Sequence, residues 1–412
     1  MMDRPLRFCM ITTFYPPYNF GGDGIYVHRL ANELARRGHQ VEVIHCLDAY
    51  NLLARRAPSQ DYADHPNVTV HGLKSPWGLL SPLVTQQTGF PFFKSARIRQ
   101  ILDKGFDVIN YHNISLVGGP KILEYGRGVK LYSIHEYWLI CPTNTLFKFI
   151  RSPCTRPQCL ACSLLYKRPP QWWRYFGLLT AALKQVDAFI TPNRFCKSIY
   201  EQMDFTAPFV QIPYFVSVEG HQQQTFDEAI GESAPQKPYF LFVGRLEKFK
   251  GLQTLIPIFR QYGKAQLLVA GKGSYEQQLR QLAEGCANIR FLGHLSDGQL
   301  QAVCRQAVAL IVPSLTYEVF ALVVVEAFRV QTPVIARNLG GMREMVEESG
   351  GGIVYNTSEE LVAAMELLLS NPSLRVEMGW LGYKAFQRRW TPEIHLQKYL
   401  GLIRKIQRNE PV

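Results

Sequence analysis

Two cations follow a short apolar run in the second half of the chain, and their spacing suits a diphosphate. The run is Tyr239 to Val243, and the next eight residues read GRLEKFKG. Arg245 offers a planar fork of donors and Lys250 a point charge, which together match two phosphate groups. A helix predicted directly after this turn would add the free amides of its first turn. The pattern predicts an anion site, although a solvated basic turn would have the same sequence.

Two carboxylates, Glu318 and Glu326, stand further along the chain with seven apolar residues between them. We expect Glu318 near the start of a helix, which puts Glu326 about two turns and ~12 Å along the axis. Carboxylates accept hydrogen bonds from hydroxyls, so the pair could bind two sugars, a transferred hexose and the ribose of a nucleotide. The alternative is a capping Glu318 and a Glu326 held by an ion pair, because a buried charge needs a partner.

The elements that would position these residues form two α/β units. Strands alternate with helical patterns, which is typical of doubly wound parallel sheets. In the first half we predict strands at 7–12, 40–45, 107–111 and 130–134. In the second half we predict strands at 239–243, 266–270, 289–292, 308–312 and 333–336. Two such sheets imply a cleft between their carboxyl ends, the edge at which open α/β sheets bind ligands.

Domain boundaries follow from a change of composition. Residues 218–238 are polar and almost free of apolar pattern, which indicates a linker. We therefore predict an N-terminal domain over 1–216 and a C-terminal domain over 217–391. In the tail, residues 392–407 are expected to form a helix, and the C-terminal segment 392–412 is expected to pack back on the first domain.

Composition narrows the class of protein. The chain has 412 residues, of which 47% are hydrophobic and 19% charged, as in ordinary globular proteins. No apolar stretch approaches the ~18 residues of a membrane span, and no signal peptide is expected, which favours the cytoplasm. The net charge of +12 suits anionic partners. Without a basic helix or an RNA-binding aromatic signature, we do not expect nucleic acid among them.

Taken in order, these motifs resemble those of the retaining glycosyltransferases of family 4, which have the GT-B fold of two facing Rossmann-like domains. The resemblance rests on Arg245 with Lys250, followed by Glu318 and Glu326. It extends over nearly the whole chain through weaker motifs: Gly21-Gly22, Tyr26-Val27, Leu30-Ala31, Arg37-Gly38-His39, Asp107 to His112, His135-Glu136-Tyr137, Gly271-Lys272-Gly273 and Gly340-Gly341.

The resemblance implies a role for each motif. Arg245 and Lys250 would bind the donor diphosphate, Glu318 the sugar hydroxyls and Glu326 the ribose. The remaining expected contacts are the Gly22 backbone on the phosphate, His112 beside the donor sugar and acceptor, and amides around Phe320, Ala321 and Leu322 on donor oxygens. No cofactor is expected at the reaction centre, and the sequence contains no Asp-x-Asp.

Two positions depart from the family pattern. Ala321 stands where many members have glycine, and its methyl is expected to narrow the backbone approach to the donor. Glu136 replaces the usual aspartate and adds one methylene. We expect altered donor choice at Ala321 rather than loss of activity.

The predicted activity is transfer of a hexose from a nucleoside-diphosphate sugar to an acceptor hydroxyl, with retention, in glycan, polysaccharide or glycolipid synthesis. The alternatives are a non-catalytic sugar-nucleotide-binding module and a nucleotide-sugar epimerase on the same fold. A phosphorylase would need a lysine carrying pyridoxal phosphate, for which there is no motif. A dinucleotide-dependent oxidoreductase is disfavoured because no G-x-G-x-x-G follows the first strand.

Four cysteines form a separate cluster with the spacing C-x12-C-x4-C-x2-C: Cys141, Cys154, Cys159 and Cys162. Four thiolates with a terminal C-x-x-C suit a structural zinc ion, and an iron–sulfur cluster uses the same ligands. Unpaired thiols and a redox disulfide are the alternatives.

The segment Tyr137 to Val186 has no Asp or Glu, seven Lys and Arg, and the aromatic residues Trp172, Trp173, Tyr175 and Phe176. Mixed basic and aromatic residues favour a glycan or lipid-linked acceptor of anionic character, and peripheral contact with the inner face of a membrane. The alternative is a solvated loop whose aromatic side chains pack into the domain.

Overall fold

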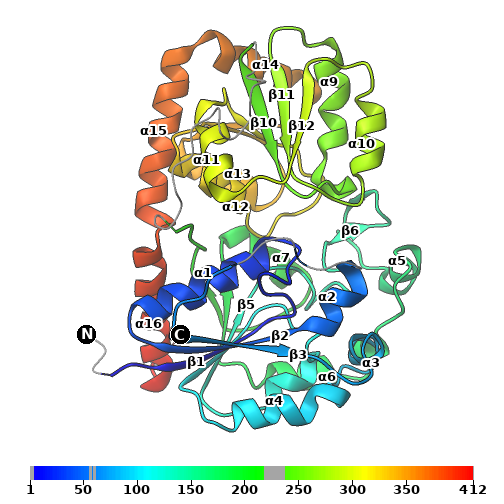
Figure 1. Cartoon of the computed structure of the whole chain (residues 1–412), viewed down its shortest axis with the longest axis vertical. Coiled ribbons are helices and arrows are strands. Elements are labelled where there is room, and N and C mark those ends of the chain that lie inside the picture. The colour runs from blue at the N-terminus through cyan, green and yellow to red at the C-terminus, as the bar shows by residue number, and fades with distance from the viewer. Residues whose placement is uncertain (1–3, 55–57, 59–61, 218–236, 412) are drawn as a thin grey trace.

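The computed structural model describes residues 4–54, 58, 62–217 and 237–411. Two parallel sheets, each flanked by helices, form two domains that lie one above the other in Figure 1. The predicted α/β class is therefore confirmed. The predicted linker falls almost entirely outside the described residues, which resume at Lys237.

The N-terminal domain is built on a seven-stranded parallel sheet with the order β3-β2-β1-β4-β5-β8-β9. Its strands are β1 (Arg7–Ile11), β2 (Gln40–Cys46), β3 (Val68–Leu73), β4 (Val108–Tyr111), β5 (Val129–Ser133), β8 (Ala188–Thr191) and β9 (Phe209–Gln211). Around it lie α1 (Gly22–Arg36), α2 (Leu47–Ala54), α3 (Leu80–Thr88), α4 (Ser95–Leu102), α5 (Cys159–Leu165), α6 (Leu178–Leu183) and α7 (Arg194–Gln202). Short 3-10 turns are η1 (Phe92–Lys94), η2 (Pro120–Glu124) and η3 (Trp172–Tyr175), and β6 (Phe147–Lys148) pairs antiparallel with β7 (Ser152–Pro153).

The C-terminal domain has a six-stranded parallel sheet with the order β12-β11-β10-β13-β14-β15. Its strands are β10 (Tyr239–Val243), β11 (Gln266–Ala270), β12 (Ile289–Gly293), β13 (Leu310–Val312), β14 (Val334–Arg337) and β15 (Gly352–Tyr355). Its helices are η4 (Lys248–Lys250), η5 (Leu252–Thr254), α9 (Ile256–Gln261), α10 (Glu276–Leu282), α11 (Asp297–Gln306), α12 (Leu322–Arg329), α13 (Gly341–Ser349), α14 (Ser358–Ser370) and α15 (Pro372–Arg389).

Helix α1 shows how the sequence sets the first element of the site. Its apolar residues recur at helical spacing and are fully buried in one core cluster with β1, namely Val27, Leu30, Ala31 and Leu34. Gly38 follows the helix with φ of 85°, a conformation that glycine adopts without steric cost. Helix α1 begins at the edge of the sheet where the strands end, and its N-terminus lies beside the second domain.

The last helix, α16 (Pro392–Gln407), lies against the N-terminal domain. Leu396, Tyr399, Leu402 and Ile403 are buried in the same core cluster as α1. The Tyr399 hydroxyl accepts a hydrogen bond from Asn110 Nδ2 at 2.9 Å. In Figure 1, α15 and α16 run down one side of the molecule and join the two domains.

No helix among the described residues combines the length and the apolar character that a membrane span requires.

Candidate active site

The N-termini of two helices meet where the domains face each other. Helix α1 begins at Gly22, and α12 begins at Leu322, and neither has a side-chain cap on its first-turn amides. A Cβ atom on Gly22 would stand 3.2 Å from Leu322 Cδ1, so the two ends nearly touch. A Cβ on Gly21 would lie 3.7 Å from Arg245 Nε. Uncapped helix N-termini beside an exposed arginine form a site for an anion.

Lys250 and Glu318 lie on the C-terminal side of this place. Lys250 Nζ donates to Glu318 Oε1 at 2.7 Å, and the Ser314 hydroxyl donates to the same oxygen at 2.7 Å. Burial alone would raise the pKa of Glu318, but Lys250, Ser314 and the nearby Arg245 outweigh it and lower that pKa. Glu318 is thus held as a carboxylate between the two cations that were predicted to bind phosphate.

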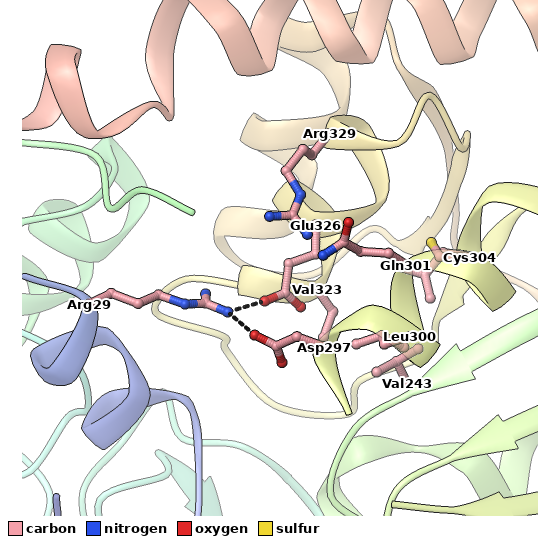
Figure 2. A pocket seen from close by; sticks show the side chains of 10 residues that line it. Arg29, Val243, Asp297, Leu300, Gln301, Cys304, Val323, Glu326 and Arg329 are labelled. Atoms are coloured by element: carbon pink, nitrogen blue, oxygen red, sulfur yellow. Dashed lines mark hydrogen bonds and ion pairs between the residues drawn. The ribbon is translucent and has the colours of Figure 1, made fainter. Parts of the chain in front are cut away.

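Glu326 lies in a separate pocket between the domains, which Figure 2 shows from close by. Arg29 reaches from α1 into this pocket, where its Nη2 lies 3.0 Å from Glu326 Oε1 and 3.4 Å from Asp297 Oδ2. Burial would lower the pKa of Arg29, but the two carboxylates reverse this and raise it. The apolar part of the pocket wall is formed by Val243, Leu300, Cys304, Leu310 and Val323.

Two histidines, the buried His112 and the half-buried His135, close the N-terminal side of the site. His112 follows β4, and its Nδ1 lies 2.8 Å from His135 Nε2. Burial and the neighbouring His135 and His395 hold the pKa of His112 well below its usual value, so the ring is neutral. Its other nitrogen, Nε2, is buried and has no hydrogen-bond partner among the described residues. A neutral imidazole with a free nitrogen is suited to a hydrogen bond with a sugar hydroxyl.

Glu136 stands next to this pair. Its Oε2 accepts a hydrogen bond from Asn144 Nδ2 at 2.7 Å, whereas its buried Oε1 has no partner in the described part of the chain. Burial, with Asp23 nearby, raises the pKa of Glu136 to about 8. The carboxyl group is therefore largely protonated near neutral pH and can donate a hydrogen bond as well as accept one.

Comparison with known families matches this arrangement. The model described as "Glycosyltransferase Family 4" matches residues 20–219, and that described as "Glycosyl transferases group 1" matches residues 223–385. The chain belongs to glycosyltransferase family 4. An uncharacterized glycosyltransferase of Methanocaldococcus jannaschii is 25% identical over 376 residues, with 87% of each chain covered.

Solved structures of related enzymes have the same GT-B fold. Sucrose-phosphate synthase of Thermosynechococcus elongatus superposes with a TM-score of 0.75 at 20% identity, covering 98% of this chain and 100% of that one. Anabaena HepE, solved with UDP-glucose, gives a TM-score of 0.65 at 15% identity, covering 96% and 99%. The predicted family, fold and enzyme class of this glycosyltransferase are thus confirmed.

The structure brings most of the predicted site residues of the glycosyltransferase together. Gly22, Arg245, Lys250, Glu318 and the 320–322 backbone meet at the facing helix ends, and His112 lies near them in the N-terminal domain. One expectation was wrong, because α12 begins at Leu322 rather than near Glu318. Glu318 is instead a loop residue that Ser314 holds, so the two glutamates are not two turns apart on one helix.

Ala321 is accommodated differently from our expectation. It has φ of −91°, which any L-residue adopts, and it is buried among the core residues of the C-terminal domain beside Val324 and Val325. The methyl group thus belongs to that core, and the backbone conformation here does not require glycine.

The four clustered cysteines of the glycosyltransferase line one small cavity, together with Leu146 and Phe147. The Phe149 amide donates to Cys162 Sγ at 3.5 Å, and Asn144, which binds Glu136, lies in the same loop. In the described residues, no group of three or more His, Cys, Asp or Glu side chains has the arrangement of a metal site. Metal binding here stays a prediction.

Three polar residues of the site were missed in the sequence. Arg29 pairs with Glu326 and with Asp297, and Ser314 bonds Glu318, but these three come from α1, from the start of α11 and from the loop after β13. Arg29 pairs with Glu326 across 297 positions of sequence. No local pattern could indicate that pair, since it exists only where the two domains meet.

Proposed function

We propose that this glycosyltransferase moves a hexose from a nucleoside-diphosphate sugar to a hydroxyl of a glycan or lipid-linked acceptor, with retention of anomeric configuration. The product would enter a glycan, a polysaccharide or a glycolipid, and the enzyme would act in the cytoplasm. The observation that carries the proposal is the meeting of two uncapped helix N-termini with Arg245, beside the Lys250–Glu318 pair.

This meeting point supports a role in stabilising the leaving group. As the glycosidic bond breaks, negative charge grows on the oxygen of the departing nucleoside diphosphate. The first-turn amides of α1 and α12 and the two cations are fixed beforehand, so they stabilise that charge without reorganising. Their effect is therefore greater on the transition state than on the ground state. No metal ion or other cofactor is part of the proposed step.

The remaining site residues would bind either the nucleoside or the sugar of the donor. Glu326 lies in a pocket between the domains with one apolar wall, which suits a nucleoside whose ribose hydroxyls reach the carboxylate. Glu318 stands beside Lys250, where it would orient Lys250 and accept hydrogen bonds from the donor hexose. His112 Nε2 has no partner, and the donor sugar would supply one. A solved relative holds UDP-glucose, which supports this class of donor.

Same-face attack by the acceptor is our proposal for the stereochemical course. The sugar would become oxocarbenium-like, and the departing diphosphate would stay on the face from which the acceptor hydroxyl approaches. Glu318, the carboxylate of the donor half, is engaged by Lys250 and Ser314, which argues against its use as a covalent nucleophile. Glu136, on the other side, is largely protonated near neutral pH.

A donor screen tests the proposal. Thermal unfolding is measured with UDP-, GDP- and ADP-sugars and with each free nucleoside diphosphate. We expect one nucleotide series to raise Tm, and its sugar to be transferred to a hydroxyl acceptor. The anomeric configuration of the product, read by NMR, should match that of the donor. If no nucleoside diphosphate raises Tm, the proposed donor class is wrong, and inversion would refute the proposed course.

A further inference from the structure

The net charge of the chain is concentrated in two segments of the N-terminal domain. Residues 65–102 and 137–186 contain no Asp or Glu, and they hold eleven of the 45 Lys and Arg. The rest of the chain carries 34 of these cations against 33 acids, so it is close to neutral. Almost the whole excess of +12 therefore belongs to these two segments.

The same segments carry most of the exposed large apolar side chains. Of the seventeen such side chains in the described residues, twelve lie on these two stretches: Val70, Trp77, Leu79, Leu80, Phe92, Phe93, Leu160, Leu164, Leu165, Trp172, Tyr175 and Phe176. Phe176 is 81% exposed, and Tyr175 and Leu164 are each 60% exposed. Apolar exposure concentrated in this way marks an interaction surface.

Packing joins the two segments into one surface. Trp173 is buried, and its Nε1 donates to the Gln86 carbonyl at 2.8 Å, which ties η3 to α3. Trp77 stacks on Phe93 with ring centroids 5.3 Å apart. Figure 1 shows α3 and α5 at the same edge of the N-terminal domain. We call the exposed residues of 74–93 and 151–176 the apolar-basic face.

Only part of the basic charge is available to a partner. The Arg174 guanidinium is half-buried, bonds the carbonyls of Trp138 and Leu139, and lies over the Trp173 ring. Arg151, Arg156 and Lys167 are exposed, and within the described residues none of them forms a salt bridge. These three cations stand on the same stretch of chain as Leu164, Trp172 and Phe176.

We infer that the apolar-basic face docks the enzyme onto an anionic bilayer surface. Exposed cations are drawn to anionic head groups, while leucine and aromatic side chains enter the interfacial region. A polyanionic glycan would match the charge but would leave eleven apolar side chains in water. The inference extends the proposed lipid-linked acceptor, but it does not depend on it, because docking requires no donor.

Vesicle co-sedimentation of the full chain without donor tests docking. Vesicles of phosphatidylcholine alone are compared with vesicles containing 30% phosphatidylglycerol, by mole, at low and high salt (about 20 and 500 mM, where screening differs strongly). We expect binding to the anionic vesicles only, and its loss at high salt. The triple variant Arg151→Gln, Arg156→Gln, Lys167→Gln should bind on the order of 100-fold more weakly, since each cation near an anionic surface contributes separately.

A second variant tests the apolar contribution. Trp172→Ser with Phe176→Ser should weaken vesicle binding at least tenfold while leaving the affinity for nucleoside diphosphate unchanged. The matched control changes exposed residues elsewhere, Trp380→Ser on α15 with Lys398→Gln and Lys405→Gln on α16, and should bind vesicles like the wild type. Quenching by brominated lipid should reach Trp172, so that a Trp172→Phe variant is quenched less, whereas Trp380→Phe is quenched as much as the wild type.

Three results would overturn the inference. They are failure of the wild type to bind anionic vesicles at low salt, equal weakening by the control variant, and binding to a soluble polyanion such as heparin without binding to vesicles. None of these would affect the donor proposal, because nucleoside diphosphate affinity is measured separately. Conversely, vesicle binding by a chain that ignores every nucleoside diphosphate would leave docking intact and remove the proposed function.

Discussion

The surroundings of Glu318 and those of His112 and Glu136 differ in how many buried polar atoms already have partners. On the C-terminal side, Glu318 is held by Lys250 and Ser314 through two hydrogen bonds of 2.7 Å. On the N-terminal side, His112 Nε2 and Glu136 Oε1 are buried without partners in the described residues. A buried polar atom without a partner costs free energy, and a substrate that supplies the partner recovers it.

The difference indicates that the Lys250–Glu318 pair on the C-terminal side is preorganised. The hydrogen bonds of His112 and Glu136 on the N-terminal side are instead completed by what binds there. Charged groups that are already in place stabilise the transition state most, since they need no reorganisation during the reaction. Open hydrogen-bonding positions contribute specificity instead, because a substrate that lacks the matching hydroxyl leaves those atoms unpaired.

A large effect on catalysis is expected at Arg245. Arg245→Ala removes a cation from the facing helix ends and should lower kcat/KM by ~10²–10³, the scale for loss of one preorganised charge or donor. Steady-state kinetics with the donor found in the screen measure this. Lys248→Ala is the matched control, because Lys248 is exposed and lies in the same basic turn. Normal transfer by Arg245→Ala would show that the donor half is not the catalytic one.

The two glutamates should separate binding from transfer. Glu318→Ala should abolish transfer and spare the affinity for free nucleoside diphosphate, since it acts on the sugar side. Glu326→Gln keeps an oxygen for Arg29 but loses the charge, and should weaken nucleoside diphosphate binding by about tenfold, the worth of one charge-assisted hydrogen bond. Isothermal calorimetry of both variants decides the roles, and the reverse pattern would exchange them.

The cavity lined by the four cysteines lies in the loop that also contains Asn144, the partner of Glu136. If the four thiols bind zinc, the purified protein should contain about one ion per chain. Cys159→Ser should lose the ion and lower stability by roughly 2 kcal/mol or more, because metal binding couples to folding. Metal analysis and thermal unfolding measure both, with Cys286→Ser as the control outside the cavity. Metal-free protein that is folded and active would refute this prediction.

Glu136 predicts how stability depends on pH. Its pKa is raised to about 8 in the folded protein from 4.5, so the folded state binds more protons than the unfolded state between these values. Stability should therefore fall as pH rises from about 4.5 to about 8. Glu136→Gln resembles the protonated form and should be more stable than the wild type at pH 8 by about 1–2 kcal/mol. Urea unfolding of both proteins at pH 5 and pH 8 measures this. An equal change in the free energy of unfolding between the two pH values in the wild type and the variant would contradict it.

The smallest expected effect is on domain closure. Arg29→Ala removes ion pairs that join α1 to α11 and α12, so the unliganded variant should be slightly more open. Small-angle scattering should show a radius of gyration larger by about a few per cent, which saturating donor reverses. An unchanged radius in both variant and wild type, with and without donor, would indicate that the domains do not move.

The sequence predicted the parts of the structure that repeat a strong local pattern. The strands at 239–243 and 266–270 and the helix at 392–407 have the predicted bounds. The strands β3, β8, β9 and β15 were not recognised; β3, β9 and β15 form sheet edges and β8 lies next to one, and all except β3 have no more than four residues.

Contacts between distant segments could not be predicted in the same way. The Arg29–Glu326 pair depends on how the domains face each other. The burial of Trp173 and Arg174, beside the exposed Trp172 and Phe176, depends on α3 packing under η3. The acid-free composition of 137–186 indicated a special surface, but only the packing separates the side chains that face outward from those that hold the segment in place.

The return of α16 to the N-terminal domain has a consequence for how the chain is made and rearranged. Tyr26 bonds His395 at 2.9 Å, and Asn110 bonds Tyr399, so residues of the first domain pair with residues that are synthesised after the second domain. The nascent first domain cannot complete its core while the second is still being synthesised. A recombinant that exchanges donor specificity with a relative at residue 217 should therefore keep 392–407 from the parent that supplied the first half.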